Sequence, residues 1–105
     1  MQNRFEVQIQ EYAKNDLNIF FDYLLENSKE FYVVEKLYEK FQDAFLKLEY
    51  LHSSMPFSQF KRLRQKGYRK FLVGNYVILY RVSEHEKKVI VDRIFHTAQD
   101  YVKNI

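Results

Sequence analysis

The sequence predicts an α+β fold of order β-α-α-β-β-β, in which two consecutive helices pack on one face of a small, mostly antiparallel sheet. Three observations lead to it. Apolar and polar residues alternate near the N-terminus, apolar residues recur at helical spacing from about residue 11 to 48, and three apolar runs separated by turn-forming residues follow from residue 68. The 105 residues fit a single domain, residues 1–105, that buries roughly 65% of its unfolded surface.

The first half of the chain contains one predicted strand and both predicted helices. Residues 5–9 alternate between apolar and polar types, which is typical of a half-buried strand. A helix is predicted from about Glu11 to Glu26, and polar residues 27–28 interrupt its pattern. Ser28 is a candidate N-cap for the second helix. The apolar stripe of that helix consists of Val34, Leu37, Tyr38, Phe41, Phe45 and Leu48.

The second half predicts a meander of three strands. Turn-forming Ser and Pro residues at 52–59 indicate a loop, and Gly74-Asn75 predicts a two-residue turn between strands 68–73 and 76–82. The continuous apolar run of the second of these strands suits a central strand covered on both faces. A last strand is predicted at 89–95. His52 and His85 fall in predicted loops, and we expect both at the surface.

Charge is distributed unevenly along the chain. Residues 1–60 carry 6 Lys and Arg against 10 Asp and Glu, a net charge of −4, whereas residues 61–105 carry 11 against 4, a net charge of +7. The second half therefore predicts an anionic partner, either nucleic acid or an acidic protein. The chain has no cysteine, no apolar run long enough to span a membrane and no signal peptide pattern, so we expect a cytoplasmic protein without disulfides.

Two segments, GYRKFLVGNYVILYRV at 67–82 and VIVDRIFHTAQDY at 89–101, together with the element order, resemble the RelE/ParE toxin family over nearly the whole chain. The resemblance implies a toxin of a type II toxin-antitoxin system that arrests bacterial growth and is neutralised by a cognate antitoxin protein. It implies one of two activities. The toxin is either a RelE-like endonuclease that cleaves mRNA on the ribosome, or an inhibitor of DNA gyrase. Fold alone does not choose between them.

Four residues are candidates for catalysis if the chain is a nuclease. Cleavage of RNA without a metal needs groups that transfer protons and cations that stabilise the charged phosphorane. The predicted hairpin register places Lys70 and Arg81 on one sheet face, where they would hold the phosphate. His96 and Tyr101 lie where nucleases of the family place acid-base groups, although a lone histidine at a strand end is as often structural. We expect no metal and no cofactor, since no phosphate-binding glycine loop or metal-ligand motif is present.

One departure from the family pattern favours a target other than mRNA. RelE-type nucleases carry an arginine directly after the tyrosine that opens the second hairpin strand, and here Tyr76 is followed by Val77. The sequence thus favours ParE-like inhibition of DNA gyrase or another non-nuclease target, with mRNA cleavage and a binding module without catalysis as alternatives. A set of basic residues is the candidate surface for the antitoxin or for nucleic acid: Lys61, Arg62, Arg64, Lys66 and Arg69.

Overall fold

The computed structural model describes residues 4–27 and 30–97 and confirms the α+β class. The strands are β1 (Glu6–Ile9), β2 (Arg69–Val73), β3 (Tyr76–Ser83) and β4 (Lys88–His96). The helices are α1 (Glu11–Asn27), α2 (Phe31–Leu51) and the short α3 (Lys61–Gln65). The expected N-cap Ser28 lies outside the described residues, and the N-cap of α2 is instead Glu30, whose backbone is extended. No helix in the described part of the chain is long and apolar enough to cross a membrane.

The four strands form one mixed sheet in the order β1-β4-β3-β2. β2, β3 and β4 are a continuous antiparallel meander, and β1 pairs with β4 in parallel. The β2–β3 turn is the predicted one: Gly74 has φ +57°, a conformation that glycine adopts without steric cost, and Val73 pairs with Tyr76. The hairpin register expected from the sequence is therefore confirmed.

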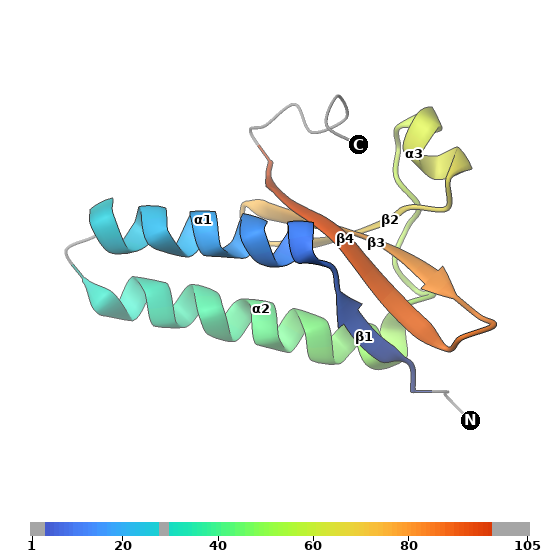
Figure 1. The fold of residues 1–105 in the computed structure, drawn as a ribbon, viewed down its shortest axis with the longest axis horizontal. Helices are drawn as coiled ribbons and strands as arrows, with labels where there is room; N and C mark the ends of the chain where they lie inside the picture. The colour runs from blue at the N-terminus through green and yellow to red at the C-terminus, as the bar shows by residue number, and fades with distance from the viewer. Residues whose placement is uncertain (1–3, 28–29, 98–105) are drawn as a thin grey trace.

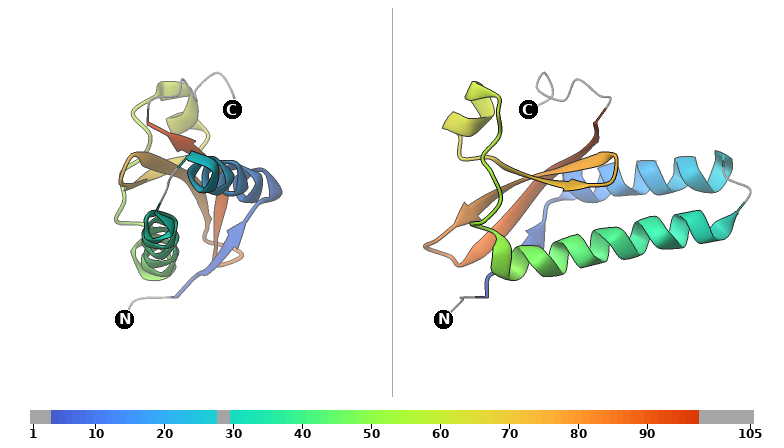
Figure 2. Two further views of the ribbon diagram at one scale, coloured as in Figure 1. Left: turned by 90° about the vertical axis from the view of Figure 1, so that its left-hand side faces the viewer. Right: turned by 180° about the vertical axis from the view of Figure 1, so that it is seen from behind.

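The helices lie on both faces of the sheet, with the two long helices on one face and the short helix on the other. α1 and α2 run side by side as an antiparallel hairpin against one face and extend beyond the sheet (Figures 1 and 2). α3 covers part of the opposite face, which we call the open face. The sequence did not predict α3, because five residues are too few to show a helical period and only Leu63 of KRLRQ is apolar.

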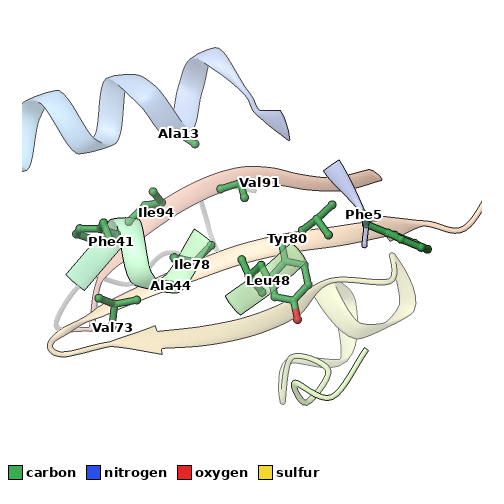
Figure 3. Packing of buried hydrophobic residues seen from close by; sticks show 11 residues of the cluster. Phe5, Ala13, Phe41, Ala44, Leu48, Val73, Ile78, Tyr80, Val91 and Ile94 are labelled. Carbon is green, nitrogen blue, oxygen red and sulfur yellow. The ribbon is translucent and has the colours of Figure 1, made fainter. Parts of the chain in front are cut away.

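The main hydrophobic core fills the space between the sheet and the α1–α2 hairpin. Figure 3 shows Ala13 of α1 and Phe41, Ala44 and Leu48 of α2 directed toward strand residues such as Ile78. A smaller cluster on the open face consists of Leu63, Val77, Leu79 and Phe95. Because β3 contributes to both clusters, its central residues are buried on both faces, as its continuous apolar run predicted.

The prediction for His52 was wrong, and that for His85 was right. His52 is 6% exposed: its ring stacks on Phe5 with 4.1 Å between centroids, and its Nδ1 lies 3.1 Å from the carbonyl oxygen of Leu48. The hydroxyl of Tyr80 also donates to the carbonyl of His52 at 2.7 Å. His52 closes the C-terminal end of α2 against the sheet, which a loop assignment made from neighbouring Ser and Pro residues does not reveal. His85 is exposed in the β3–β4 turn.

Candidate functional site on the open face of the sheet

The pleat of β2 and β3 places the two predicted phosphate-binding residues on one face. Lys70 pairs with Leu79, whose side chain belongs to the cluster beneath α3. Side chains alternate along a strand, so Arg81 lies on the same face as Leu79. Lys70 and Arg81 thus both project from the open face, as the predicted register required.

Arg81 is held by a carboxylate. Its Nε donates to Oδ2 of Asp92 at 2.6 Å and its Nη2 donates to Oδ1 at 3.3 Å, while its guanidinium lies 5.6 Å from the ring centroid of Tyr68. The hydrogen bond to Asp92 raises the pKa of Arg81 above its ordinary value. Burial, and then the Asp92 carboxylate, raise the pKa of Tyr68. The Arg81 charge is therefore largely neutralised within the protein.

A second arginine on this face, Arg93, was not identified from the sequence. It is fixed by Asp16 of α1, whose carboxylate accepts from Nε at 2.8 Å and from Nη2 at 3.1 Å and also accepts from the backbone N–H of Ile94 at 2.9 Å. The guanidinium lies 4.6 Å from the ring centroid of Phe95 and 5.9 Å from that of Tyr12. The hydrogen bond to Asp16 raises the pKa of Arg93.

A β-bulge in β4 explains how Arg93 reaches the open face on which Arg81 also lies. The pairing of β3 with β4 shifts between Leu79, which pairs with Arg93, and Tyr80, which pairs with Val91. Asp92 is the extra residue, and so it has no partner in the ladder. No sequence pattern signals this bulge. The 77 residues that separate Asp16 from Arg93 likewise hide their contact from any local analysis.

The predicted proton-transfer residue His96 lies on the other face. It pairs with Tyr76 at the end of β4, and the two rings meet edge to face with 5.3 Å between centroids. Tyr76 packs against Phe20 of α1 and Phe41 of α2, which places this pair on the side of the helical hairpin. The structure thus separates His96 from the cations of the open face. Tyr101, the other predicted proton-transfer residue, lies outside the described residues.

The predicted basic surface divides into two parts. Lys61, Arg62, Arg64 and Lys66 are exposed on and just after α3, and Nη1 of Arg64 donates to the carbonyl of Gln59 at 3.1 Å. Arg69, by contrast, pairs with Tyr80 of the main core, and its guanidinium carbon stacks 3.8 Å from the ring centroid of the exposed Phe57. The cations of α3 and Lys70 of β2 therefore lie on the open face, and Arg69 of β2 lies on the face covered by α1 and α2.

The open face carries cations, but the described residues do not supply an acid-base pair next to them. Among residues 4–27 and 30–97, no group of three or more His, Asp or Glu side chains is arranged to hold a metal ion. The titratable neighbours of Arg81 are Asp92, which is engaged in the ion pair, and Tyr68, whose pKa is raised. Such a surface favours electrostatic binding over proton transfer.

Comparisons with known proteins agree with this architecture. Among the solved structures that resemble it is a chain of the chromosomal ParDE toxin-antitoxin system from P. aeruginosa, with a TM-score of 0.70 and 14% identity. Another is a chain of the toxin-antitoxin complex RelBE2 from Mycobacterium tuberculosis, with a TM-score of 0.59 and 18% identity. Each likeness covers 89% of this chain and 96% or 98% of the other, respectively, and at these identities it shows the fold alone.

The family of this chain is assigned from its sequence. None of the curated proteins has a matching sequence. Residues 7–101 match the family described as the ParE toxin of the type II toxin-antitoxin system parDE. This match covers the helical hairpin, the sheet and the open face. The chain therefore belongs to the ParE toxin family of type II toxin-antitoxin systems.

Proposed function

We propose that this protein arrests bacterial growth as a ParE-like toxin that inhibits DNA gyrase and does not cleave RNA. The observation that carries the proposal is the separation of His96 from Lys70 and Arg81 by the sheet. General acid-base catalysis requires the proton-transfer group within hydrogen-bond reach of the reacting atoms, and therefore close to the cations that stabilise the phosphorane. A histidine and cations on opposite faces do not meet that requirement.

The environment of Val77 also supports a non-nuclease function. Family resemblance places an arginine at this position in the nucleases, and Val77 is 2% exposed in the cluster beneath α3 with Leu63 and Phe95. An arginine at this position would therefore lie beneath the short helix and not at the surface. The two strand arginines of the open face, Arg81 and Arg93, are each neutralised by a carboxylate.

Two assays on the purified protein test the proposal. We expect inhibition of DNA supercoiling by gyrase, and intact mRNA in a cell-free translation reaction at the same concentration. His96→Ala should inhibit gyrase as well as the unmodified protein does, because its ring packs on Tyr76 and away from the open face. Ribosome-dependent mRNA cleavage with unaffected supercoiling would support the RelE-like alternative, and loss of cleavage in His96→Ala would then identify the catalyst. Inactivity in both assays would leave a binding module without catalysis.

Membership of this family supports a cognate antitoxin as partner, and the helical hairpin offers a surface for it. A groove of about 440 Å³ lies against α2, lined by apolar and acidic residues that include Phe21, Val34, Glu35 and Glu39. At its rim, Phe31 is 64% and Tyr38 53% exposed, unusually high for aromatic residues. An amphipathic helix of the antitoxin, apolar on one side and basic at its edges, fits this surface. The expectation from charge, an acidic segment on or near the basic sheet surface, stays a prediction.

Two substitutions separate these possibilities. Phe31→Glu should weaken binding of the antitoxin encoded beside this chain, and Leu72→Glu should not, although Leu72 at the edge of β2 is 60% exposed. Co-expression of the antitoxin should restore growth to cells that produce the unmodified protein. Equal binding by Phe31→Glu, or normal growth of cells that produce soluble toxin alone, would contradict the proposal.

A further inference from the structure

Positive charge is concentrated where α3 meets β2. From residue 50 to residue 83 the chain contains seven Lys and Arg residues and no Asp or Glu. We call five of them the basic corner: Lys61, Arg62, Arg64, Lys66 and Lys70. The first four are exposed, and Lys70 projects from β2 on the face that α3 covers. Figures 1 and 2 show α3 at the end of the molecule that lies away from the C-terminal end of α1.

The lysines of the basic corner have no acidic partner in the described part of the chain. The described ion pairs join Arg4, Arg81 and Arg93 to Glu49, Asp92 and Asp16, and Lys14 to Glu11. Lys61, Lys66 and Lys70 take part in none of them. The positive charges of these three lysines repel one another, and a bound polyanion relieves that repulsion.

The basic corner is built on fixed structure. Leu63 is fully buried on the open face and anchors α3 to the sheet. Arg64 ties the helix to the preceding loop, since its Nη1 donates to the carbonyls of Ser58 at 3.4 Å and Gln59 at 3.1 Å. The backbone N–H of Lys70 also donates to the carbonyl of Pro56 at 3.1 Å, which joins the loop to β2. The positions of the charges are therefore set before any ligand binds.

The aromatic side chains of this region indicate which polyanion fits. Unpaired bases are recognised by stacking on exposed aromatic rings. Phe60 and Tyr68 pack against the cluster beneath α3, and one face of Phe57 is covered by Arg69 at 3.8 Å. Phe57 bridges with Arg69 and therefore lies on the sheet face opposite Lys70. The described aromatic rings on the side of the corner's lysines are thus packed against the protein, which suits a regular phosphate backbone whose bases are already stacked.

We propose that the basic corner binds the phosphate backbone of duplex DNA without reading its sequence. Lys61, Lys66 and Lys70 each contact a phosphate, with Arg62 and Arg64 beside them. Gyrase acts on duplex DNA, so a toxin that binds both would be held near its target. The inference does not rest on gyrase inhibition, because it concerns a direct contact between this protein and DNA.

Fluorescence anisotropy with a labelled 20-base-pair duplex of arbitrary sequence tests the proposal over a range of salt concentrations. Five phosphate contacts predict that log Kd rises with log salt concentration with a slope of about 4.5, because each neutralised phosphate releases about 0.9 counterion. The triple variant Lys61→Gln, Lys66→Gln, Lys70→Gln should lower that slope by about 2.7 and weaken binding by about tenfold or more at low salt.

The chain provides a control of equal charge. Lys36, Lys40 and Lys47 are exposed on α2 among acidic residues, and their triple Gln variant removes the same charge from another surface. We expect it to keep the slope of the unmodified protein, with both variants folded by circular dichroism. Equal weakening by the two variants would overturn the assignment to the corner, as would no binding of duplex at low salt.

Two further ligands complete the experiment. Polyglutamate that displaces the duplex at equal charge concentration would make the corner a surface for acidic protein. A 20-nucleotide single-stranded RNA that binds more tightly than the duplex would make it a surface for unpaired RNA. Either result would refute the proposal for duplex DNA. The anisotropy experiment contains no gyrase. DNA binding can therefore be observed even if the protein does not inhibit gyrase, and gyrase inhibition can be observed even if the protein does not bind DNA.

Discussion

Replacement of Asp16 should destabilise the protein more than replacement of any surface carboxylate. The Asp16 side chain is 11% exposed and that of Arg93 24%, and the carboxylate accepts three hydrogen bonds, two from Arg93 and one from the N–H of Ile94. Removing one partner of a buried ion pair costs about 3–5 kcal/mol. The partial exposure of Arg93 lowers this cost, whereas the orphaned N–H of Ile94 adds about 1–3 kcal/mol.

We therefore expect Asp16→Ala to lower the free energy of unfolding by about 3 kcal/mol, a large part of the roughly 5–15 kcal/mol typical of a domain. Asp16→Asn keeps one oxygen that can accept from the N–H of Ile94, but it removes the charge and replaces the other acceptor of Arg93 by an N–H donor, so it should cost less than Asp16→Ala. Urea unfolding followed by circular dichroism gives both values, provided that the dependence on denaturant is unchanged.

The Arg4–Glu49 pair is the control for this experiment. Its atoms lie 3.0 Å apart, and the Glu49 side chain is 17% exposed, but that of Arg4 is 67% exposed, so Glu49→Gln should cost clearly less than Asp16→Ala. If Asp16→Ala costs no more than Glu49→Gln, the reasoning that burial makes the Asp16–Arg93 contact a strong one is wrong.

Three further predictions concern the sheet. Burial raises the pKa of Tyr80, so the folded state loses stability as the pH rises above about 10, the pKa of an unfolded tyrosine. At pH 8, Tyr80→Phe should lower the free energy of unfolding by about 1 kcal/mol, because the hydrogen bond to His52 is missing. Between pH 8 and pH 10.5, urea unfolding should show a smaller further loss of stability for Tyr80→Phe than for the unmodified protein. Gly74→Ala should cost about 1 kcal/mol, since the new Cβ meets no atom within 4 Å but φ stays at +57°; no measurable loss would show that the turn relaxes. Val77→Arg introduces the arginine that RelE-type nucleases carry at this position. It should destabilise the protein by about 3 kcal/mol or more and give no mRNA cleavage, because the guanidinium would be buried under α3. A stable variant that cleaves mRNA would show that α3 moves aside.

The sequence predicted the fold well where local pattern and packing agree. The alternation at residues 5–9 produced β1, and the turn at Gly74 set the register of β2 on β3 by geometry alone. The apolar stripe of α2 faces the sheet through Phe41 and Leu48, although Tyr38 is 53% exposed. The centroid of the Tyr38 ring lies 6.1 Å from that of Phe21 of α1, and helical spacing does not show which part of a stripe meets a neighbouring helix and not the sheet.

What the sequence did not predict depends on contacts between distant residues. α3 forms because Leu63 finds a pocket on the open face, and its short polar segment carries no helical period. Asp16 looks like an ordinary polar position of α1 until β4 places Arg93 beside it. His52 is buried because Phe5, 47 positions earlier in the chain, supplies the ring on which it stacks.

The grouping of catalytic candidates depended on which sheet face each strand residue occupies. Lys70 and Arg81 share a face because their strands are joined by a two-residue turn, which fixes both register and pleat. His96 comes three residues after Arg93, so along a regular strand the two side chains point to opposite faces, and the helix-side contact of His96 with Tyr76 agrees. The bulge at Asp92 lies before both residues and does not bring them together. A cationic face without the histidine is suited to holding phosphates, so the same pleat that argues against cleavage supports binding of a nucleic-acid backbone.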